Sequence, residues 1–179
     1  MIGLFSALYI VTSGLASFVS QLGYPEHFLR GILMTALILR TGRKWSAAMM
    51  GLVSGLVFLA VVPSPAPYLL PSTFVSGLVF DLSLVIGSSY WAAAQSRTRL
   101  VIGAAISGFA ESIVALSILT VGAPSVLGKT FQVITTAWFL DLSLNIVLSS
   151  IGAILAIRFL SPRSRSRLPS SQPATLTSQ

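Results

Sequence analysis

The sequence predicts an all-α membrane protein with six transmembrane helices and both termini in the cytoplasm. Of its 179 residues, 54% are hydrophobic and 8% are charged, and the mean hydropathy is +0.89. Soluble domains carry about 25% charged residues. Long apolar runs recur along the chain, and basic residues gather between alternate runs. We therefore interpret the 11 Lys and Arg, set against 4 Asp and Glu, as signals of membrane topology rather than of nucleic-acid binding.

Six apolar runs approach the roughly 20 residues that a transmembrane helix needs. The first twenty residues contain no Lys or Arg, and no convincing cleavage site follows, so we expect a retained helix rather than a signal peptide. The second run is short and is expected to be tilted, kinked or shielded by its neighbours. The last is long enough to tilt or to extend into the cytoplasm. The predicted spans are 2–22, 28–41, 45–62, 73–94, 99–121 and 131–160.

The connections between these spans differ in charge. Nine basic residues follow the second, fourth and sixth runs, and two, Arg30 and Lys129, belong to the opposite side. The positive-inside rule then places both termini in the cytoplasm. Residues 1–160 are predicted to form the transmembrane domain, and residues 161–179, rich in Ser, Pro and Arg, a disordered basic tail that also attracts anionic lipid. The third connection holds four prolines and is expected to be a stiff connector or a lid that carries Tyr68.

Three of the four acids lie inside predicted spans, and two of them share nearly the same surroundings, FDLSL and LDLSL. A carboxylate near the bilayer centre costs about 2.5–3.5 kcal/mol, so such residues usually face a bundle interior or a watered cavity. Asp81, Glu111 and Asp141 each lie about eight to ten residues from the outer end of a span, or roughly 12–16 Å deep. We therefore expect the three acids to meet around one pocket that opens to the outside.

Helical spacing adds small, polar and aromatic residues to the faces that carry these acids. Trp138 offers a flat surface for stacking, and Asn145 offers donors and an acceptor. Arg30 is expected either to neutralise one acid or to contact the solute. The alternative is a structural role, in which the acids bond to Ser, Thr or Arg30. The complete predicted site is Asp81, Glu111, Asp141, Asn145, Trp138, Gly77, Ser107, Arg30 and Tyr68.

Small and aromatic residues elsewhere have simpler interpretations. Ala47, Gly51 and Gly55 follow one another at four-residue steps, which predicts close packing against another helix of the chain in preference to a subunit contact. Trp45, Tyr90 and Trp91 lie near the predicted inner boundary. Tryptophan and tyrosine are enriched at that depth, so these three residues are expected to be membrane anchors.

No motif for catalysis, a cofactor or a metal is recognisable. The chain has no cysteine, which excludes disulfides and thiolate metal sites, and it has no P-loop, G-x-S-x-G or H-E-x-x-H motif. His27 lies beside Glu26 in a predicted outer connection and is expected to be a surface residue. We therefore expect no enzyme activity, and we predict no cofactor, resident metal or nucleic-acid partner.

The pattern of spans resembles the substrate-binding S components of energy-coupling-factor transporters. The shared features are six spans in under 200 residues, both termini inside, a short second helix and a proline-rich third loop. The stretches that look like this family are HFLRGILMTALILRTGR, SAAMMGLVSGLVF, GLVFDLSLVIG and GFAESIVAL, at 27–43, 46–58, 77–87 and 108–116. The resemblance covers about residues 1–160.

This resemblance implies a multi-pass subunit of the cell membrane that captures a vitamin, a vitamin precursor or a metal ion on the outer side. It also implies docking through small residues of the first span onto a transmembrane coupling subunit that carries two ABC ATPases. The usual alanine-x-x-x-alanine of that span is missing, and Ala7, Ala16, Ser13, Ser17 and Ser20 are the small residues in its place.

Ligand charge can be predicted from the acids. Three carboxylates favour a cationic or amine-bearing solute, such as a thiamine-like compound or its precursor, and would also suit a hard metal ion. Two other functions stay open at this point. One is a non-transport scaffold of a cell-envelope assembly, in which the acids make internal hydrogen bonds. The other is a standalone proton-coupled carrier that needs no ATPase.

Overall fold

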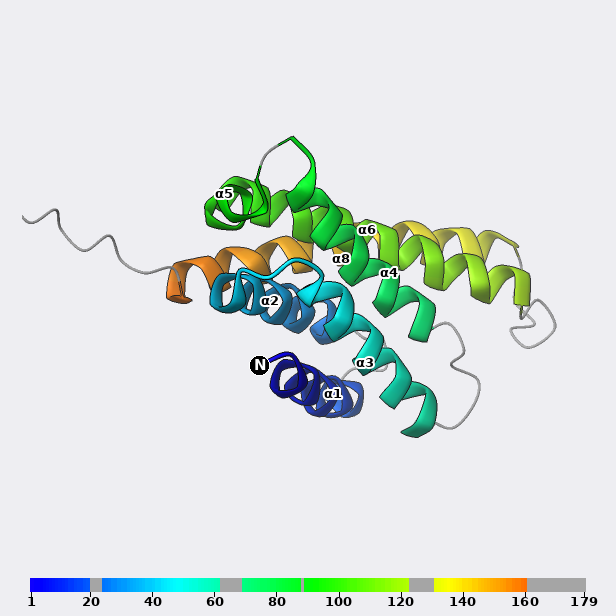
Figure 1. Cartoon of the computed structure of the whole chain (residues 1–179). Helices are drawn as coiled ribbons and strands as arrows, with labels where there is room; N and C mark the ends of the chain where they lie inside the picture. Colours follow the sequence, from blue (N-terminus) through cyan, green and yellow to red (C-terminus); the bar gives the residue numbers. More distant parts are fainter. Residues whose placement is uncertain (20–23, 62–68, 88, 123–130, 161–179) are drawn as a thin grey trace, which may run out of the picture.

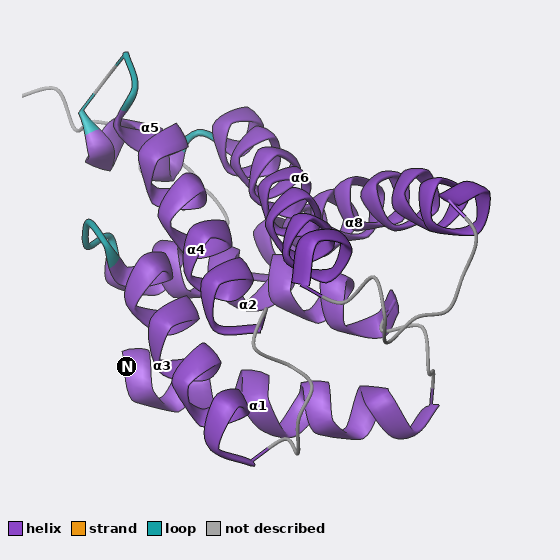
Figure 2. Cartoon of the chain, turned by 90° about the vertical axis from the view of Figure 1, so that its right-hand side faces the viewer, coloured by secondary structure: helices purple, strands orange, loops and turns teal. Residues whose placement is uncertain are grey.

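A computed structural model describes residues 1–19, 24–61, 69–87, 89–122 and 131–160 (Figure 1). Over these residues the chain is all-helical and contains no strand, which confirms the all-α part of the predicted fold class (Figure 2). Tyr68 and the predicted tail, 161–179, lie outside the described residues. The helices are α1 (Ile2–Val19), α2 (Tyr24–Thr41), α3 (Ser46–Val61), α4 (Leu69–Val85), α5 (Tyr90–Gln95), α6 (Arg97–Gly122) and α8 (Phe131–Leu160).

Two helices are long and apolar enough to cross a membrane. They are Arg97–Ile118 of α6 and Trp138–Leu160 of α8, and 33% of the most apolar part of each is buried inside the chain. Most residues in these two segments are therefore not buried inside the chain, whereas a core helix of a soluble protein is mostly buried. The apolar parts of α1, α3 and α4 are shorter. Length and composition thus support two of the six predicted spans.

The fourth predicted span, 73–94, forms two helices rather than one. Helix α4 begins at Leu69 and ends at Val85. Gly87 follows with φ +79°, a left-handed conformation that commonly ends helices and that glycine adopts without steric cost. Ser89 then caps α5, because its side chain accepts a hydrogen bond from the backbone N–H of Ala92. This turn was not predicted, although Gly87, Ser88 and Ser89 are residue types that favour turns.

The helices pack mainly in pairs. α2 lies along α8, α3 lies along α4, and α6 contacts both α4 and α8, while α1 contacts α2 and α3 (Figure 1). The contact between α2 and α8 depends on two facing glycines. A Cβ on Gly31 would overlap the backbone of Ser149, and a Cβ on Gly152 would overlap the backbone of Phe28. These glycines bring α2 close enough to α8 for their polar side chains to meet.

Small residues also join α3 to α4. Gly51 and Gly55 lie against α4, and a Cβ on Gly77 of α4 would overlap the carbonyl of Ala47. The predicted internal packing of Ala47, Gly51 and Gly55 is therefore confirmed. Gly77, which was predicted to be part of the solute site, lies in this helix contact instead.

The side chains that face outward differ in character from those that face inward. In α1, Ser6 and Ser13 are buried against other helices, whereas Leu4, Leu8 and Leu15 are exposed. Large apolar side chains are also exposed along α6 and α8, and serines are buried in α3, α4, α6 and α8. The interior also contains apolar residues such as Leu37 and Phe80, but so many exposed large apolar side chains would be unfavourable in water. The pattern is typical of helices whose outer faces contact lipid.

Candidate functional site

Polar side chains from α2, α6 and α8 form one continuous cluster, which we call the central network. Every connection in it crosses between helices or runs along one face of α8. It contains four of the residues predicted for the solute site. Its members are His27, Arg30, Glu111, Ser112, Asp141, Asn145 and Ser149.

An ion pair between Arg30 and Glu111 lies at the buried end of this network. The guanidinium of Arg30 pairs with the carboxylate of Glu111, and both residues are buried. Arg30 also donates hydrogen bonds to Asn145 Oδ1 and, over 3.2 Å, to Ser149 Oγ. A buried charge is tolerated only where such partners compensate its lost hydration. Of the two roles expected for Arg30, pairing with an acid is the one that the structure shows.

Asn145 connects the other members. Its Nδ2 donates to Ser112 Oγ over 2.9 Å and to Glu111 Oε2 over 3.4 Å, while its Oδ1 also accepts from Ser149 Oγ over 3.1 Å. Asp141, Asn145 and Ser149 are four residues apart and therefore share one face of α8. Asn145 is fully buried, and both ends of its amide have partners, so it fixes the relative positions of α6 and α8.

Asp141 forms the accessible edge of the network. Its carboxylate accepts a hydrogen bond from Ser112 Oγ over 2.7 Å and lies 3.4 Å from His27 Nε2. Its side chain is 30% exposed, compared with 12% for His27. Trp138 precedes Asp141 by almost one turn of α8. The Trp138 Nε1 and the His27 Nδ1 are buried and have no hydrogen-bond partner within the described residues. This edge therefore combines a partly exposed carboxylate with two unused ring nitrogens.

The position of His27 differs from its prediction. Helix α2 begins at Tyr24, earlier than the predicted 28, so His27 belongs to the helix and points toward α8. Glu26, beside it, also lies in α2 and accepts a hydrogen bond from the buried Tyr9 hydroxyl of α1 over 2.8 Å. The prediction of a surface histidine is therefore wrong. His27 precedes Arg30 by three residues, and this spacing was the available signal that both residues share one helix face.

Asp81 does not join the other two acids, and the expectation of a three-acid pocket is wrong. It lies four residues before the end of α4. The neighbouring Phe80 and Ser83 lie against Gly103 of α6, eight residues before Glu111. At 1.5 Å per residue, the part of α6 that faces the surroundings of Asp81 is therefore about 12 Å from Glu111. The depth was misjudged because α4 begins before residue 73 and ends before residue 94.

The carboxylate of Asp81 instead forms a second cluster, which we call the α3 cap. One oxygen accepts the backbone N–H of Ala48, in the first turn of α3, over 2.9 Å. The other accepts the hydroxyl of Tyr90 over 2.7 Å, and this hydroxyl also lies 3.0 Å from the carbonyl of Arg43. Burial and the adjacent carboxylate raise the pKa of Tyr90, so the hydroxyl keeps its proton. An acid at a helix start satisfies unpaired N–H groups and complements the helix dipole.

The other predicted residues have different environments. Tyr90 is buried and is not the membrane anchor that was expected, while Trp45 and Trp91 are exposed. Ser107 is buried and donates to the carbonyl of Ala104 in its own helix over 2.9 Å. The structure therefore brings together Arg30, Glu111, Asp141 and Asn145, with Trp138 on the adjoining turn. No cluster of three or more His, Asp or Glu suited to a metal ion occurs in the part of the chain that the structure describes.

Comparison with protein-family models, curated proteins and solved structures gives no significant match. The resemblance to transporter S components therefore depends on the sequence stretches themselves.

Proposed function

We propose that this protein is a multi-pass membrane subunit that captures a small cationic or amine-bearing solute for an uptake transporter. Binding, rather than catalysis, is the role that suits a site of one accessible carboxylate, an indole and an imidazole. The proposal has three parts, namely placement in the membrane, the position of the solute site and the charge of the solute.

The inward-facing polar residues and outward-facing apolar residues support placement in a membrane. Lipid is the medium in which exposed leucines and isoleucines are favourable, and buried serines are then spared contact with hydrocarbon. The N-terminus and the end of α8 lie at the same end of the bundle (Figure 1). This arrangement agrees with an even number of crossings. We assign the six spans to α1, α2, α3, α4, α6 and α8, with α5 in a cytoplasmic connection.

The partial exposure of Asp141 is the single observation that carries the solute-site proposal. Arg30 already compensates Glu111, so the charge balance of the network leaves Asp141 as the carboxylate that is available to a ligand. Its bond from Ser112 and its contact with His27 fix it in place without enclosing it. A preorganised carboxylate at the edge of a buried network suits recognition of an ammonium group, an amidine or an aminopyrimidine.

The residues beside Asp141 narrow the class of solute. Trp138 can stack on a flat ring, and an aromatic face also attracts a cation. A thiamine-like compound or its aminopyrimidine precursor combines a flat ring with a basic nitrogen. An anionic vitamin would be opposed by Asp141. The predicted coupling subunit and ABC ATPases remain part of the proposal, because the network alone does not move a solute across a membrane.

A binding screen with two matched variants tests this proposal. Detergent-purified protein should gain thermal stability from thiamine-like amines and not from carboxylic acids of similar size. Asp141→Asn should weaken that binding by about tenfold or more, because a hydrogen bond to a charged group contributes about 1.5–3 kcal/mol. Asp81→Asn is the control, since it removes a buried acid outside the network. Stabilisation by acids alone, or equal losses in both variants, would contradict the proposal.

A scaffold of a cell-envelope assembly is the second candidate. The observation that favours it is the internal pairing of Glu111 with Arg30 and Asn145. A network whose polar groups bond to one another can fix helix positions without binding any ligand. Under this function, Asp141→Asn would leave assembly intact and no amine would stabilise the protein. The same screen therefore separates the two candidates.

A further inference from the structure

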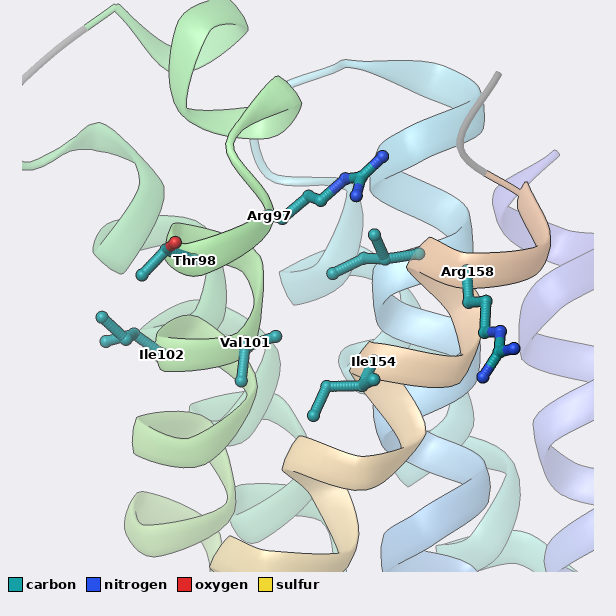
Figure 3. Close-up of a pocket in the computed structure, with 7 residues that line it drawn as sticks. Arg97, Thr98, Val101, Ile102, Ile154 and Arg158 are labelled. Atoms are coloured by element: carbon teal, nitrogen blue, oxygen red, sulfur yellow. The ribbon is translucent and has the colours of Figure 1, made fainter. Parts of the chain in front are cut away.

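A groove between the start of α6 and the end of α8 has a different chemistry from the central network. It encloses about 650 Å³, and Figure 3 shows the side chains that line it. Arg97 and Thr98 come from the first turn of α6, and Arg158 projects from the last turns of α8. Val101 and Ile154 lie on the adjoining turns of the two helices (Figure 3). The groove is therefore basic at its mouth and apolar along its wall.

The charges of this groove are not balanced by the protein. All four acids of the chain belong to the described residues, and none lines the groove. No ion pair involves Arg97 or Arg158 within the described part of the chain. Guanidinium groups form strong, geometrically specific bonds with phosphate oxygens. Arg97 and Arg158, one from each of the two helices that form the groove, therefore favour an anionic phosphate-containing ligand.

The apolar wall indicates what is attached to that group. Ile154 is 50% exposed, as is Ile102, and both lie on the helices whose outer faces are apolar. A free phosphate would leave this wall without a partner. A phospholipid would place its phosphodiester at the arginines and an acyl chain along the isoleucines. Basic pockets at the cytoplasmic side of transmembrane helices bind anionic lipid headgroups in this way.

We propose that this groove binds one anionic phospholipid of the cytoplasmic leaflet. The site is distinct from the central network, because Arg97 precedes Glu111 by 14 residues, or about 21 Å along α6. The inference rests on the proposed membrane placement and on nothing that concerns the solute. A failure here would therefore leave the amine-binding proposal standing.

Native mass spectrometry on the full-length protein tests the site. Protein released from detergent with added phosphatidylglycerol should retain one lipid, whereas phosphatidylcholine should be retained at least about fivefold less. Arg97→Gln and Arg158→Gln should each reduce phosphatidylglycerol binding about fivefold, the effect expected for one basic residue at a membrane surface. Lys44→Gln is the control, because Lys44 is an exposed basic residue that lies outside the groove.

Three outcomes would overturn the proposal. Equal retention of the two lipids by the unmodified protein would exclude headgroup selectivity and needs no variant to fold. An equal loss in Lys44→Gln would show a diffuse surface effect. Full competition by millimolar inorganic phosphate would show that the arginines bind a free anion and that the apolar wall contributes nothing. Ile154→Asn should weaken lipid binding, and in lipid-free detergent it should not change the thermal shift that an amine causes.

Discussion

Glu111 and Asp81 are both buried acids in apolar helices, yet their partners differ in kind. Glu111 pairs with the cation Arg30 from another helix. Asp81 accepts hydrogen bonds from neutral donors, the N–H of Ala48 and the hydroxyl of Tyr90. The first arrangement balances charge between two helices, whereas the second caps the start of α3 by satisfying a backbone N–H group. Both acids lie in apolar helices, so the difference arises from which helix each one faces: Glu111 faces α2, and Asp81 faces the start of α3.

The comparison also separates binding from stability. The central network has an exposed edge at Asp141, while the α3 cap is enclosed by Tyr90 and the start of α3. Changes to the cap should affect folding alone. Changes to the network should affect folding at its buried end and solute binding at its exposed edge. The following variants test this division.

Arg30→Met should have the largest effect. It leaves Glu111 buried without its cation, so the free energy of unfolding should fall by about 3–5 kcal/mol. Denaturant titration in detergent, followed by circular dichroism, measures this loss. Replacing the pair together, as Arg30→Met with Glu111→Leu, should recover most of it, because two apolar side chains avoid the cost of an uncompensated charge. A double variant as unstable as the single one would contradict the pairing.

Asp81→Ala should have an intermediate effect. It leaves the N–H of Ala48 and the hydroxyl of Tyr90 without an acceptor, which should lower the free energy of unfolding by about 1–3 kcal/mol. Asp81→Asn keeps one acceptor oxygen, so it should lower the free energy of unfolding by less than Asp81→Ala does. Thermal melts give the stability, and the amine titration gives the binding. A loss of amine binding with unchanged stability would place Asp81 in the solute site and break the comparison.

Tyr90→Phe should have the smallest effect. Asp81 keeps its hydrogen bond from Ala48, so the free energy of unfolding should fall by about 0.5–1.5 kcal/mol, which is typical of one intramolecular hydrogen bond. A double-mutant cycle with Asp81→Ala isolates the Tyr90–Asp81 interaction. If the two losses simply add, the hydroxyl is held by the carbonyl of Arg43 and contributes nothing to the cap.

The all-α class and the approximate positions of the long helices followed from composition and apolar runs. The grouping of Glu111, Asp141 and Asn145 followed from helical spacing on two long, continuous helices. The placement of Asp81 failed because α4 begins at Leu69 rather than at residue 73, so its outer end lies farther from Asp81 than predicted. His27 was missed because the boundary of α2 depends on contacts with α8 and not on local hydropathy. Pairing of Arg30 with Glu111 required knowledge of which helices are neighbours.

Helix α8 is one unbroken helix that carries Asp141 near one end and Arg158 near the other. Gly152 lies between them, at one of the two positions where α8 meets the backbone of α2 closely. If a solute at Asp141 tilted α8 about this contact, the two arginines of the groove would shift relative to each other. Any solute that changes this tilt must alter lipid affinity, and thermodynamic reciprocity then requires the lipid to alter solute affinity by the same factor. Membrane composition would thereby become an effector of nutrient capture.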